Sequence, residues 1–399
     1  MRKSLYLAAL LLTVSNVNAD SLIIDKEKTS FTNNFKIGSL NNVENVDYDS
    51  ASYNSMAFGG DIGVSYKLNN KVSFKTSLYF NKNLNSMIEI SSKNELAALK
   101  EQSGNDDYIY FGEAFVSYQP NVFTNIMVGY QSFDLSFFNT NDIRINKNSF
   151  EALALEYIAI DDVYLYGGYI NRMAGKDLRK NELVNSKYDY MYGNPLDEIG
   201  QVIFGGLKYM YSPFTNISLE AYSINEIANV FYSELETGHS YNNVIDSKVK
   251  IQYSQIMEAS DSLYNGSVGG ISGNIKYKDY EIGGGYNKAY ITDNNYINIT
   301  KGISPYYTTT DNMSIEELNY DANAFQVYLS NKMGRLNLKG SYSYYKTSNN
   351  LQEYTSIDLK GTYKYDENIK LGVTFTNLKN EVLAIDNKYI VFTSASLKF

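Results

Sequence analysis

Apolar and polar residues alternate along most of the chain, and the last twelve residues, Lys388 to Phe399, show the alternation most clearly. The apolar parity consists of Tyr389, Val391, Thr393, Ala395, Leu397 and Phe399, and the other parity carries mostly small or polar residues. Successive side chains of a β-strand point to opposite faces, so this segment is predicted to be a two-faced strand.

The same pattern recurs in eighteen segments, each near the ~9–11 residues that a tilted strand needs to cross a bilayer. These segments are 31–38, 56–67, 71–81, 107–118, 123–131, 149–158, 162–171, 200–211, 214–223, 227–235, 245–256, 267–277, 279–289, 322–331, 335–346, 353–365, 369–378 and 388–399. Segment 353–365 is typical: Ile357, Leu359, Gly361 and Tyr363 oppose Ser356, Asp358, Lys360 and Thr362.

The connections between these segments alternate between short and long. Short ones include 68–70, 212–213 and 366–368, and the long ones lie near 39–55, 82–106, 132–148, 172–199, 290–321 and 379–387. Short turns on one rim and long loops on the other are typical of outer-membrane barrels. We therefore predict an all-β fold, a transmembrane antiparallel β-barrel of about 18 strands. A soluble all-β protein is the alternative, but its paired faces would meet in an apolar core, and here they carry charges over many consecutive strands.

The N-terminus resembles a secretory leader. Arg2 and Lys3 precede an apolar run from Leu5 to Val14, and Val17-Asn18-Ala19 resembles a cleavage site. The run is too short for a membrane span, so residues 1–19 are predicted to be a signal peptide and residues 20–399 a single barrel domain.

Composition fits a barrel in the outer membrane. The 39 Tyr and 19 Phe can supply aromatic girdles at two membrane–water interfaces, and the absence of Cys excludes a disulfide framework. Removing Arg2 and Lys3 leaves 33 basic against 44 acidic residues, a net charge of −11, which does not suggest nucleic-acid binding. A single histidine, His239, without the sequence context of a Ser–His pair argues against an enzyme.

One segment, Val128 to Leu155, carries a family resemblance. Val128-Gly129-Tyr130-Gln131 ends a predicted strand, Asn139, Asp142 and Arg144 follow in an N-x-x-D-x-R pattern, and Ser149-Phe150 opens the next strand. This resembles the OprD-type outer-membrane porins, including the major outer-membrane porin of Campylobacter-like bacteria. Asn229-Val230-Phe231-Tyr232-Ser233 is a second similarity. The usual prolines of the loop and the many arginines of the basic-substrate channels are missing here.

The resemblance implies that loop 132–148 folds into the lumen and narrows the pore, with Asp134, Asp142 and Arg144 at the constriction. Opposed charges across such a gap orient dipolar solutes and tune ion preference. The C-terminal strand resembles the closing strand of such barrels, whose terminal aromatic, here Phe399, is read by the assembly machinery. Family members occur as trimers and as monomers, so a homotrimer is one of two expected states.

The polar parity yields candidates for the lumen wall. They are Asp61, Lys75, Glu113, Lys248, Lys250, Lys276, Arg335, Lys339, Asp358 and Lys360, with Glu220, Glu281 and Lys370 on the same parity. Loop 290–321 is rich in Asn, Thr, Tyr and acidic residues and is interpreted as an exposed surface loop; its carboxylates are candidates for calcium, although no D-x-D-x-D-G motif is present.

These observations predict a porin of the bacterial outer membrane that lets small hydrophilic solutes and ions diffuse through a water-filled barrel, without a cofactor, while the outer face contacts lipid. Two alternatives stay open. One is a channel selective for small carboxylates or peptides. The other is a structural or adhesive barrel that displays its loops and transports nothing.

Overall fold

The structure is a computed structural model of the chain. It describes residues 28–46, 49–84, 108–140, 146–160, 162–174, 201–242, 244–259, 263–291, 295, 297–300, 302–382 and 387–398. The predicted signal peptide lies outside these ranges.

The described chain forms eighteen β-strands, so the predicted strand count and all-β class are confirmed. The strands are β1 (Thr29–Val46), β2 (Asp49–Lys67), β3 (Val72–Asn83), β4 (Tyr108–Asn121), β5 (Thr124–Gln131), β6 (Ser149–Ile160), β7 (Val163–Ala174), β8 (Val202–Ser212), β9 (Thr215–Ile224), β10 (Ala228–Tyr241), β11 (Ile245–Glu258), β12 (Gly266–Tyr277), β13 (Tyr280–Ile291), β14 (Ala322–Met333), β15 (Leu336–Thr347), β16 (Glu353–Lys364), β17 (Ile369–Asn380) and β18 (Asn387–Lys398).

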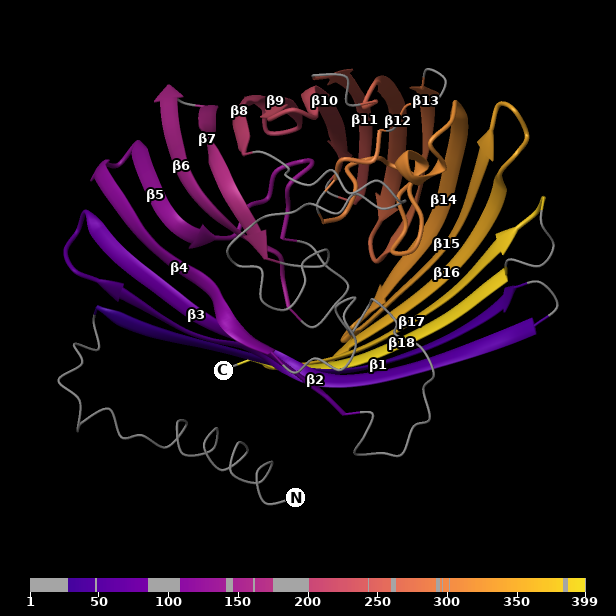
Figure 1. Cartoon of the computed structure of the whole chain (residues 1–399), viewed down its shortest axis with the longest axis horizontal. Helices are drawn as coiled ribbons and strands as arrows, with labels where there is room; N and C mark the ends of the chain where they lie inside the picture. The colour runs from indigo at the N-terminus through magenta and orange to yellow at the C-terminus, as the bar shows by residue number, and fades with distance from the viewer. Residues whose placement is uncertain are drawn as a thin grey trace.

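Each strand pairs antiparallel with its neighbours in the chain, and the sheet closes on itself because β1 pairs with β18 as well as with β2. Figure 1 shows the strands arranged as a ring in chain order, with the C-terminus beside β1 and β2. Closure leaves no strand edge unpaired, which a sheet in lipid requires because no water is available there for free backbone groups.

The prediction of a long connection at 39–55 is wrong. β1 and β2 instead continue to Val46 and from Asp49, and they pair in register along this length, from Thr29 opposite Tyr66 to Val46 opposite Asp49. The polar run Asn41-Asn42 breaks the apolar alternation but still pairs through its backbone, and backbone pairing does not depend on side-chain polarity.

The two faces of the barrel wall differ as the alternation predicts. On β16, Ile357 and Leu359 are 43% and 53% exposed on the outer face, whereas Ser356 and Asp358 are 0% and 2% exposed on the lumen face. An outer face of exposed aliphatic side chains fits a hydrocarbon surrounding. No helix among the described residues is long and apolar enough to cross a membrane.

The two rims differ in their connections. At the short-turn rim, side-chain oxygens cap tight turns: Asn69 Oδ1 accepts from the amides of Lys71 and Val72, and Asp366 Oδ1 accepts from those of Asn368 and Ile369. Such Asx turns fix hairpins of few residues. The long-loop rim carries the connections after β5 and β13, and Figure 1 shows that both of these fold back inside the ring of strands.

The interpretation of loop 290–321 as an exposed surface loop is wrong. Its described part is buried at Ile297, Ile299, Tyr306, Ile315 and Leu318, and it includes the short 3-10 helix η3 (Ile315–Leu318). These apolar side chains belong to the same buried cluster as loop residues Phe137 and Phe138. These apolar side chains are removed from water when the loop folds inward and packs on the apolar part of the lumen wall, which is favourable.

Candidate functional site: a lumen narrowed by two loops

The first inward segment is the loop after β5. Residues 133–140 form a small hairpin, in which Leu135 N donates to Phe138 O at 3.2 Å, Thr140 N donates to Phe133 O at 2.9 Å, and Asp134 and Asn139 form an isolated β-bridge. This local pairing presents three phenylalanine side chains away from the exposed Asp134. We call residues 132–140 the first loop.

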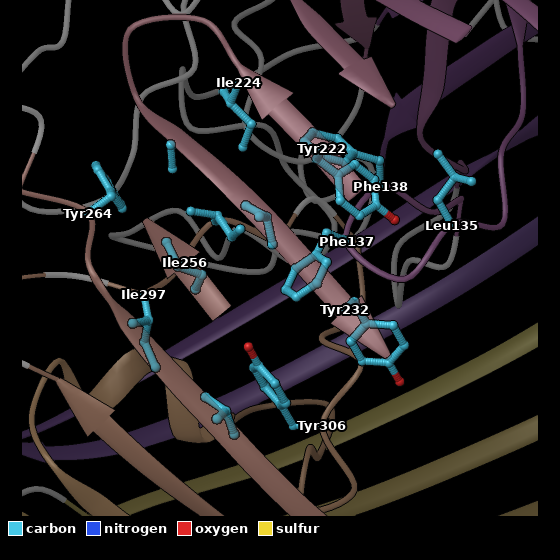
Figure 2. Close-up of a cluster of buried hydrophobic side chains, with 14 of the residues drawn as sticks. Leu135, Phe137, Phe138, Tyr222, Ile224, Tyr232, Ile256, Tyr264, Ile297 and Tyr306 are labelled. Atoms are coloured by element: carbon cyan, nitrogen blue, oxygen red, sulfur yellow. The ribbon is translucent and has the colours of Figure 1, made fainter. Parts of the chain in front are cut away.

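The phenylalanines of the first loop pack onto aromatic residues of the wall, as Figure 2 shows for Phe137 and Phe138. The Phe137 ring lies 5.7 Å from that of Tyr222 on β9 and 5.9 Å from that of Tyr232 on β10, both edge-on. The Phe138 ring lies 5.5 Å from that of Tyr222. The Phe133 ring lies 5.5 Å from that of Phe150, tilted by 40°, and 5.4 Å from that of Phe204, edge-on. Edge-to-face contacts at these distances stabilise beyond the area they bury.

Polar contacts fix the first loop at separate points. Ser132 Oγ donates to Glu113 Oε1 on β4 at 2.9 Å, and Ser136 N donates to Glu220 Oε2 on β9 at 3.0 Å. Asn139 holds the second inward segment at two points: its Nδ2 donates to Ile303 O at 2.9 Å, and its Oδ1 accepts from Ile303 N at 3.1 Å. The first loop therefore spans the lumen between wall carboxylates and another loop.

The second inward segment, residues 302–321, which we call the second loop, is held by side chains of several strands. Tyr306 Oη and Ser254 Oγ on β11 lie 2.9 Å apart, and Tyr307 Oη donates to Glu234 Oε2 on β10 at 3.0 Å. Asn287 Oδ1 on β13 accepts from Thr308 N at 3.1 Å. Tyr345 Oη on β15 donates to the Thr308 carbonyl.

Burial keeps two tyrosines of the second loop, Tyr306 and Tyr307, protonated. It raises the pKa of Tyr306 far above its usual value, and the charge of Glu316 adds to the shift. It raises the pKa of Tyr307 in the same direction, with Glu234 contributing. Both hydroxyls therefore stay protonated over the whole physiological pH range, and that of Tyr307 donates to Glu234.

The tip of the second loop reaches a third part of the wall. Asp311 Oδ2 lies 2.7 Å from Lys360 Nζ on β16, and Asn312 Nδ2 donates to Thr376 Oγ1 on β17 at 3.0 Å. Thr376 also donates to Asp358 Oδ1 at 2.5 Å. The loop thus places a carboxylate and an amide among the charged lumen residues of β16 and β17.

Together, the two loops cover one part of the lumen surface and leave another uncovered. The covered wall is the buried apolar lumen surface of β6–β15 near the long-loop rim, made of Phe150, Ala152, Ala154, Ile170, Val202, Phe204, Tyr222, Ile224, Ala228, Val230, Tyr232, Ile256, Val268, Ala289, Ala322, Ala324 and Tyr345. The open wall is the lumen surface of β1–β4 and of the short-turn half of β16–β18, where Asn34, Asp61, Lys75 and Lys360 are half-buried. Nearer the long-loop rim, Ser356, Asp358 and Thr376 are buried beside the tip of the second loop.

The open wall is polar and charged. Asn34 Nδ2 donates to Asp61 Oδ1 across the β1–β2 pair at 3.3 Å. Lys75 Nζ lies 2.7 Å from Glu113 Oε2, which also accepts from Ser77 Oγ at 3.1 Å. Both signs of charge therefore face this side of the lumen, one set on β2–β4 and another on β16.

Lysines predominate on the lumen face of the later strands. Lys248 and Lys250 on β11 lie 2.6 Å and 2.7 Å from the Glu236 carboxylate of β10. Lys339 on β15 sits directly opposite Lys360 on β16, and its Nζ lies 4.3 Å from the centre of the Tyr328 ring. Lys276 on β12 sits opposite Glu281 on β13. Among the described residues, neither Lys276 nor Lys339 forms an ion pair.

Arg335 does not line the lumen wall. It lies in the two-residue turn between β14 and β15, and its Nη1 donates to the Tyr365 carbonyl at 2.6 Å. The alternation continues by one residue past the strand end, so a parity count cannot distinguish this turn from the strand. Asp134 is exposed in the first loop, whereas Asp142, Arg144 and Phe399 lie outside the described residues.

The carboxylates considered for calcium serve separate partners. Asp311 pairs with Lys360, Glu316 accepts from Thr300 Oγ1 at 2.9 Å, and Asp321 accepts from Ile291 N at 2.6 Å. Within the described ranges, no group of three His, Asp or Glu is placed to hold a metal ion. Asp293 is outside these ranges.

The sequence did contain a signal for the covered wall. On β6, Leu153 and Leu155 are exposed on the outer face while Ala152 and Ala154 are buried on the lumen face, so both parities are apolar there. A lumen parity that turns apolar indicates that something other than water covers it. The apolar lumen parity and the apolar residues within 297–318 together predict the second inward loop.

Comparisons with known proteins establish the fold. No protein-family model matches the chain, and no curated protein matches it. Among solved structures, Acinetobacter baumannii OccAB4 is 15% identical with a TM-score of 0.73, covering 94% of this chain and 100% of that one. Pseudomonas aeruginosa OpdQ is 14% identical with a TM-score of 0.74, covering 93% and 97%. Pseudomonas aeruginosa OpdK, solved with vanillate, is 11% identical with a TM-score of 0.73, covering 93% and 99%. These are porins of the OprD/Occ type, and the chain shares their eighteen-stranded barrel.

Proposed function

We propose that the chain is an outer-membrane porin of the OprD type through which small hydrophilic solutes and ions diffuse passively. The observation that carries the proposal is the closed ring of eighteen strands with an apolar outer face and a charged, uncovered part of the lumen. A barrel of this size is wide enough for an aqueous channel. Diffusion of this kind needs neither a cofactor nor an energy source.

The route of the solute follows the open wall. The two loops fill the lumen beside β6–β15, so a solute passes between the loops and the strands β1–β4 and β16–β18. Asp61, Lys75 and Glu113 face this route from one side, and Asp311 with Lys360 faces it from another. Charges of both signs around a narrow passage orient a dipolar solute and exclude poorly solvated ones.

Conductance of the refolded mature protein in a planar bilayer under a salt gradient tests the proposal. We expect stable unitary steps, with a reversal potential whose sign shows which charges dominate the passage. Correctly folded protein without steps would contradict the pore and would favour a barrel that only displays its loops.

A second candidate is a channel selective for small carboxylates. The specific observation is that Lys339 and Lys360 face each other on neighbouring strands, where like charges repel. Asp311 compensates Lys360, so a solute anion would be favoured beside Lys339. Lys339 forms no ion pair with any described residue, so its charge is available to a solute. The solved OpdK structure contains vanillate, an aromatic carboxylate.

Current block by vanillate added on one side of the bilayer tests this candidate. We expect block in the unmodified protein and a weaker block in Lys339→Met, whose unbranched side chain is one atom shorter and uncharged. Equal block in the two proteins would remove the lysine pair from the candidate site.

The cellular setting follows from the same proposal. We propose that residues 1–19 direct export, that the outer face contacts outer-membrane lipid, and that Phe399, which follows β18 in the sequence, is recognised by the barrel-assembly machinery. Cross-linking in native membranes distinguishes a homotrimer from a monomer. Truncation of Phe399 should impair membrane assembly more than Lys398→Ala does, and equal insertion yields would contradict the role of the terminal residue.

A further inference from the structure

A buried carboxylate on the covered wall has no role in the route described above. Glu220 lies on the lumen face of β9 and is only 4% exposed. Among the described residues it forms no ion pair, unlike Glu113, which faces Lys75. A carboxylate removed from water is costly unless hydrogen-bond donors replace the water, so its retention requires an explanation.

Three neutral donors surround this carboxylate. Tyr166 Oη on β7 donates to Oε1 at 2.7 Å, Tyr222 Oη donates to Oε2, and the backbone amide of Ser136 donates to Oε2 at 3.0 Å. Two of the donors belong to the wall, and one belongs to the first loop, 84 residues away in sequence. The carboxylate therefore joins the loop to a preorganised pair of tyrosine hydroxyls.

The hydrogen bond from Ser136 to Glu220 lies where it can fix the course of the first loop. Ser136 lies at the turn of the hairpin, between Leu135 and the two phenylalanines that pack on Tyr222 and Tyr232. Aromatic packing alone tolerates sliding of one ring over another, whereas a hydrogen bond from a backbone amide fixes the distance and direction of the chain. Hydrogen bonds to a charged acceptor are also stronger than those to neutral ones.

We propose that Glu220 is the positioning residue of the first loop: it fixes the hairpin turn against the covered wall and so sets the width of the passage along the open wall. This inference rests on the proposed function for its consequence in transport, but the position of the loop can be measured without transport.

The first test is single-channel recording of Glu220→Ala and Glu220→Gln. Loss of one hydrogen bond to a charged group corresponds to roughly a tenfold change in an equilibrium or more, so the detached-loop population in Glu220→Ala should rise at least about tenfold, seen as open-channel noise and brief closures. Glutamine keeps one oxygen to accept from Ser136 N, so Glu220→Gln should largely restore a quiet current.

The reversal potential separates positioning from a direct effect of charge. Because Glu220 is buried away from the open wall, Glu220→Gln should leave ion preference unchanged. A shifted reversal potential with a quiet current would contradict the proposal and assign Glu220 to the field of the passage.

A matched control is Glu156→Ala. Glu156 faces the lumen from β6 and accepts from Asn125 Nδ2 at 3.0 Å, and none of its described hydrogen bonds reaches either loop. Its replacement should leave the open-channel noise at the level of the unmodified protein. If Glu220→Ala does not fold, the Tyr166→Phe variant, which removes one donor and keeps the ring, should raise the noise about fivefold.

A spin label at position 134 reads the loop directly. The chain has no cysteine and Asp134 is exposed, so Asp134→Cys gives a single attachment site on the hairpin. We expect the label to be more mobile in Glu220→Ala than in otherwise unmodified protein, whether or not the barrel conducts. Unchanged mobility overturns the positioning role, while increased mobility in a barrel without unitary steps would contradict only the proposed transport.

Discussion

The covered and open walls of the lumen are built from the same strand pattern, but the first packs against loops and the second faces water. On the covered wall, Phe150 and Tyr222 are buried beneath loops whose phenylalanines pack on them. On the open wall, Asp61 and Lys75 are half-buried and keep hydrogen-bonding partners of their own. The difference shows that one lumen serves as both a hydrophobic core and a polar surface.

The division explains how a wide barrel becomes narrow without losing strands. Closing a ring of eighteen strands fixes its diameter, so its passage can be reduced only by filling part of the interior. A loop that fills part of the lumen beside water needs apolar side chains toward the wall and polar side chains toward the passage. The first loop meets this requirement with Phe137 and Phe138 below and Asp134 exposed.

The largest expected effect comes from the covered wall. Phe138→Ala removes a side chain that is 0% exposed, and deletion of a buried phenylalanine costs about 3–5 kcal/mol. Urea unfolding in detergent micelles, followed with the spin label at position 134, should show the loop detaching well before the barrel unfolds. Phe115→Ala, in a half-buried lumen position on β4, is the matched control and should cost clearly less.

The next effect concerns the contact between the two loops. Asn139→Ala removes both hydrogen bonds to Ile303 and should weaken the coupling of the loops by about 1–3 kcal/mol. Proteolysis at limiting protease should then cut within the second loop faster than in the unmodified protein. Asn139→Asp keeps the acceptor for Ile303 N and loses the donor, so an intermediate rate is expected; equal rates in all three proteins would contradict the coupling.

A smaller effect is expected where charges face the passage. Lys360→Met leaves Asp311 without its cation 2.7 Å away, so the cation-to-anion permeability ratio should rise about two- to fivefold. The measurement is the reversal potential under a salt gradient. Adding Asp311→Asn removes the uncompensated charge and should return the permeability ratio toward its starting value. A ratio that stays high in the double variant would show that Asp311 does not cause the rise.

The smallest effect is expected near the short-turn rim. Lys248 pairs with Glu236 at 2.6 Å, but its side chain is 46% exposed, and exposed ion pairs contribute little because water and salt screen them. Lys248→Met should change the free energy of unfolding by less than about 1 kcal/mol. If Lys248→Met lowered the free energy of unfolding as much as Phe138→Ala does, the stability of the protein would not depend mainly on the covered wall.

The strand order and the two faces of the wall could be predicted because they depend on a local rule. Ile357 and Asp358 alternate in the sequence as they do across the wall, and every predicted segment corresponds to a strand. The strand ends do not follow from this rule: Arg335 continues the alternation into a turn, and β1 continues through Asn41 and Asn42 where the alternation ends. Backbone pairing determines these ends, and the side-chain pattern records it only indirectly.

The site could be predicted only in part because its contacts join distant segments. Glu220 and Glu113 lie on the polar parity, so a lumen position was expected for both, but nothing near Glu220 in sequence shows that its partner is the amide of Ser136. The inward course of the second loop was missed, since its Asn, Thr and Tyr content is also that of an exposed loop. Tyr306 and Tyr307 are instead bonded to Ser254 on β11 and Glu234 on β10, and Tyr345 on β15 donates to the Thr308 carbonyl.

The scattered anchors of the two loops have a consequence for the order of assembly. Asn139 contacts Ile303 across 164 residues of chain, and the second loop needs acceptors and donors from β10, β11, β13, β15, β16 and β17. Contacts between such distant segments form slowly because the intervening chain must first lose its freedom. The hairpins between neighbouring strands therefore form first, whereas docking of the second loop needs strands from β10 to β17 to be in place. A barrel whose loops have not yet docked would be wider and leakier, and the rate of docking would determine how long that stage lasts.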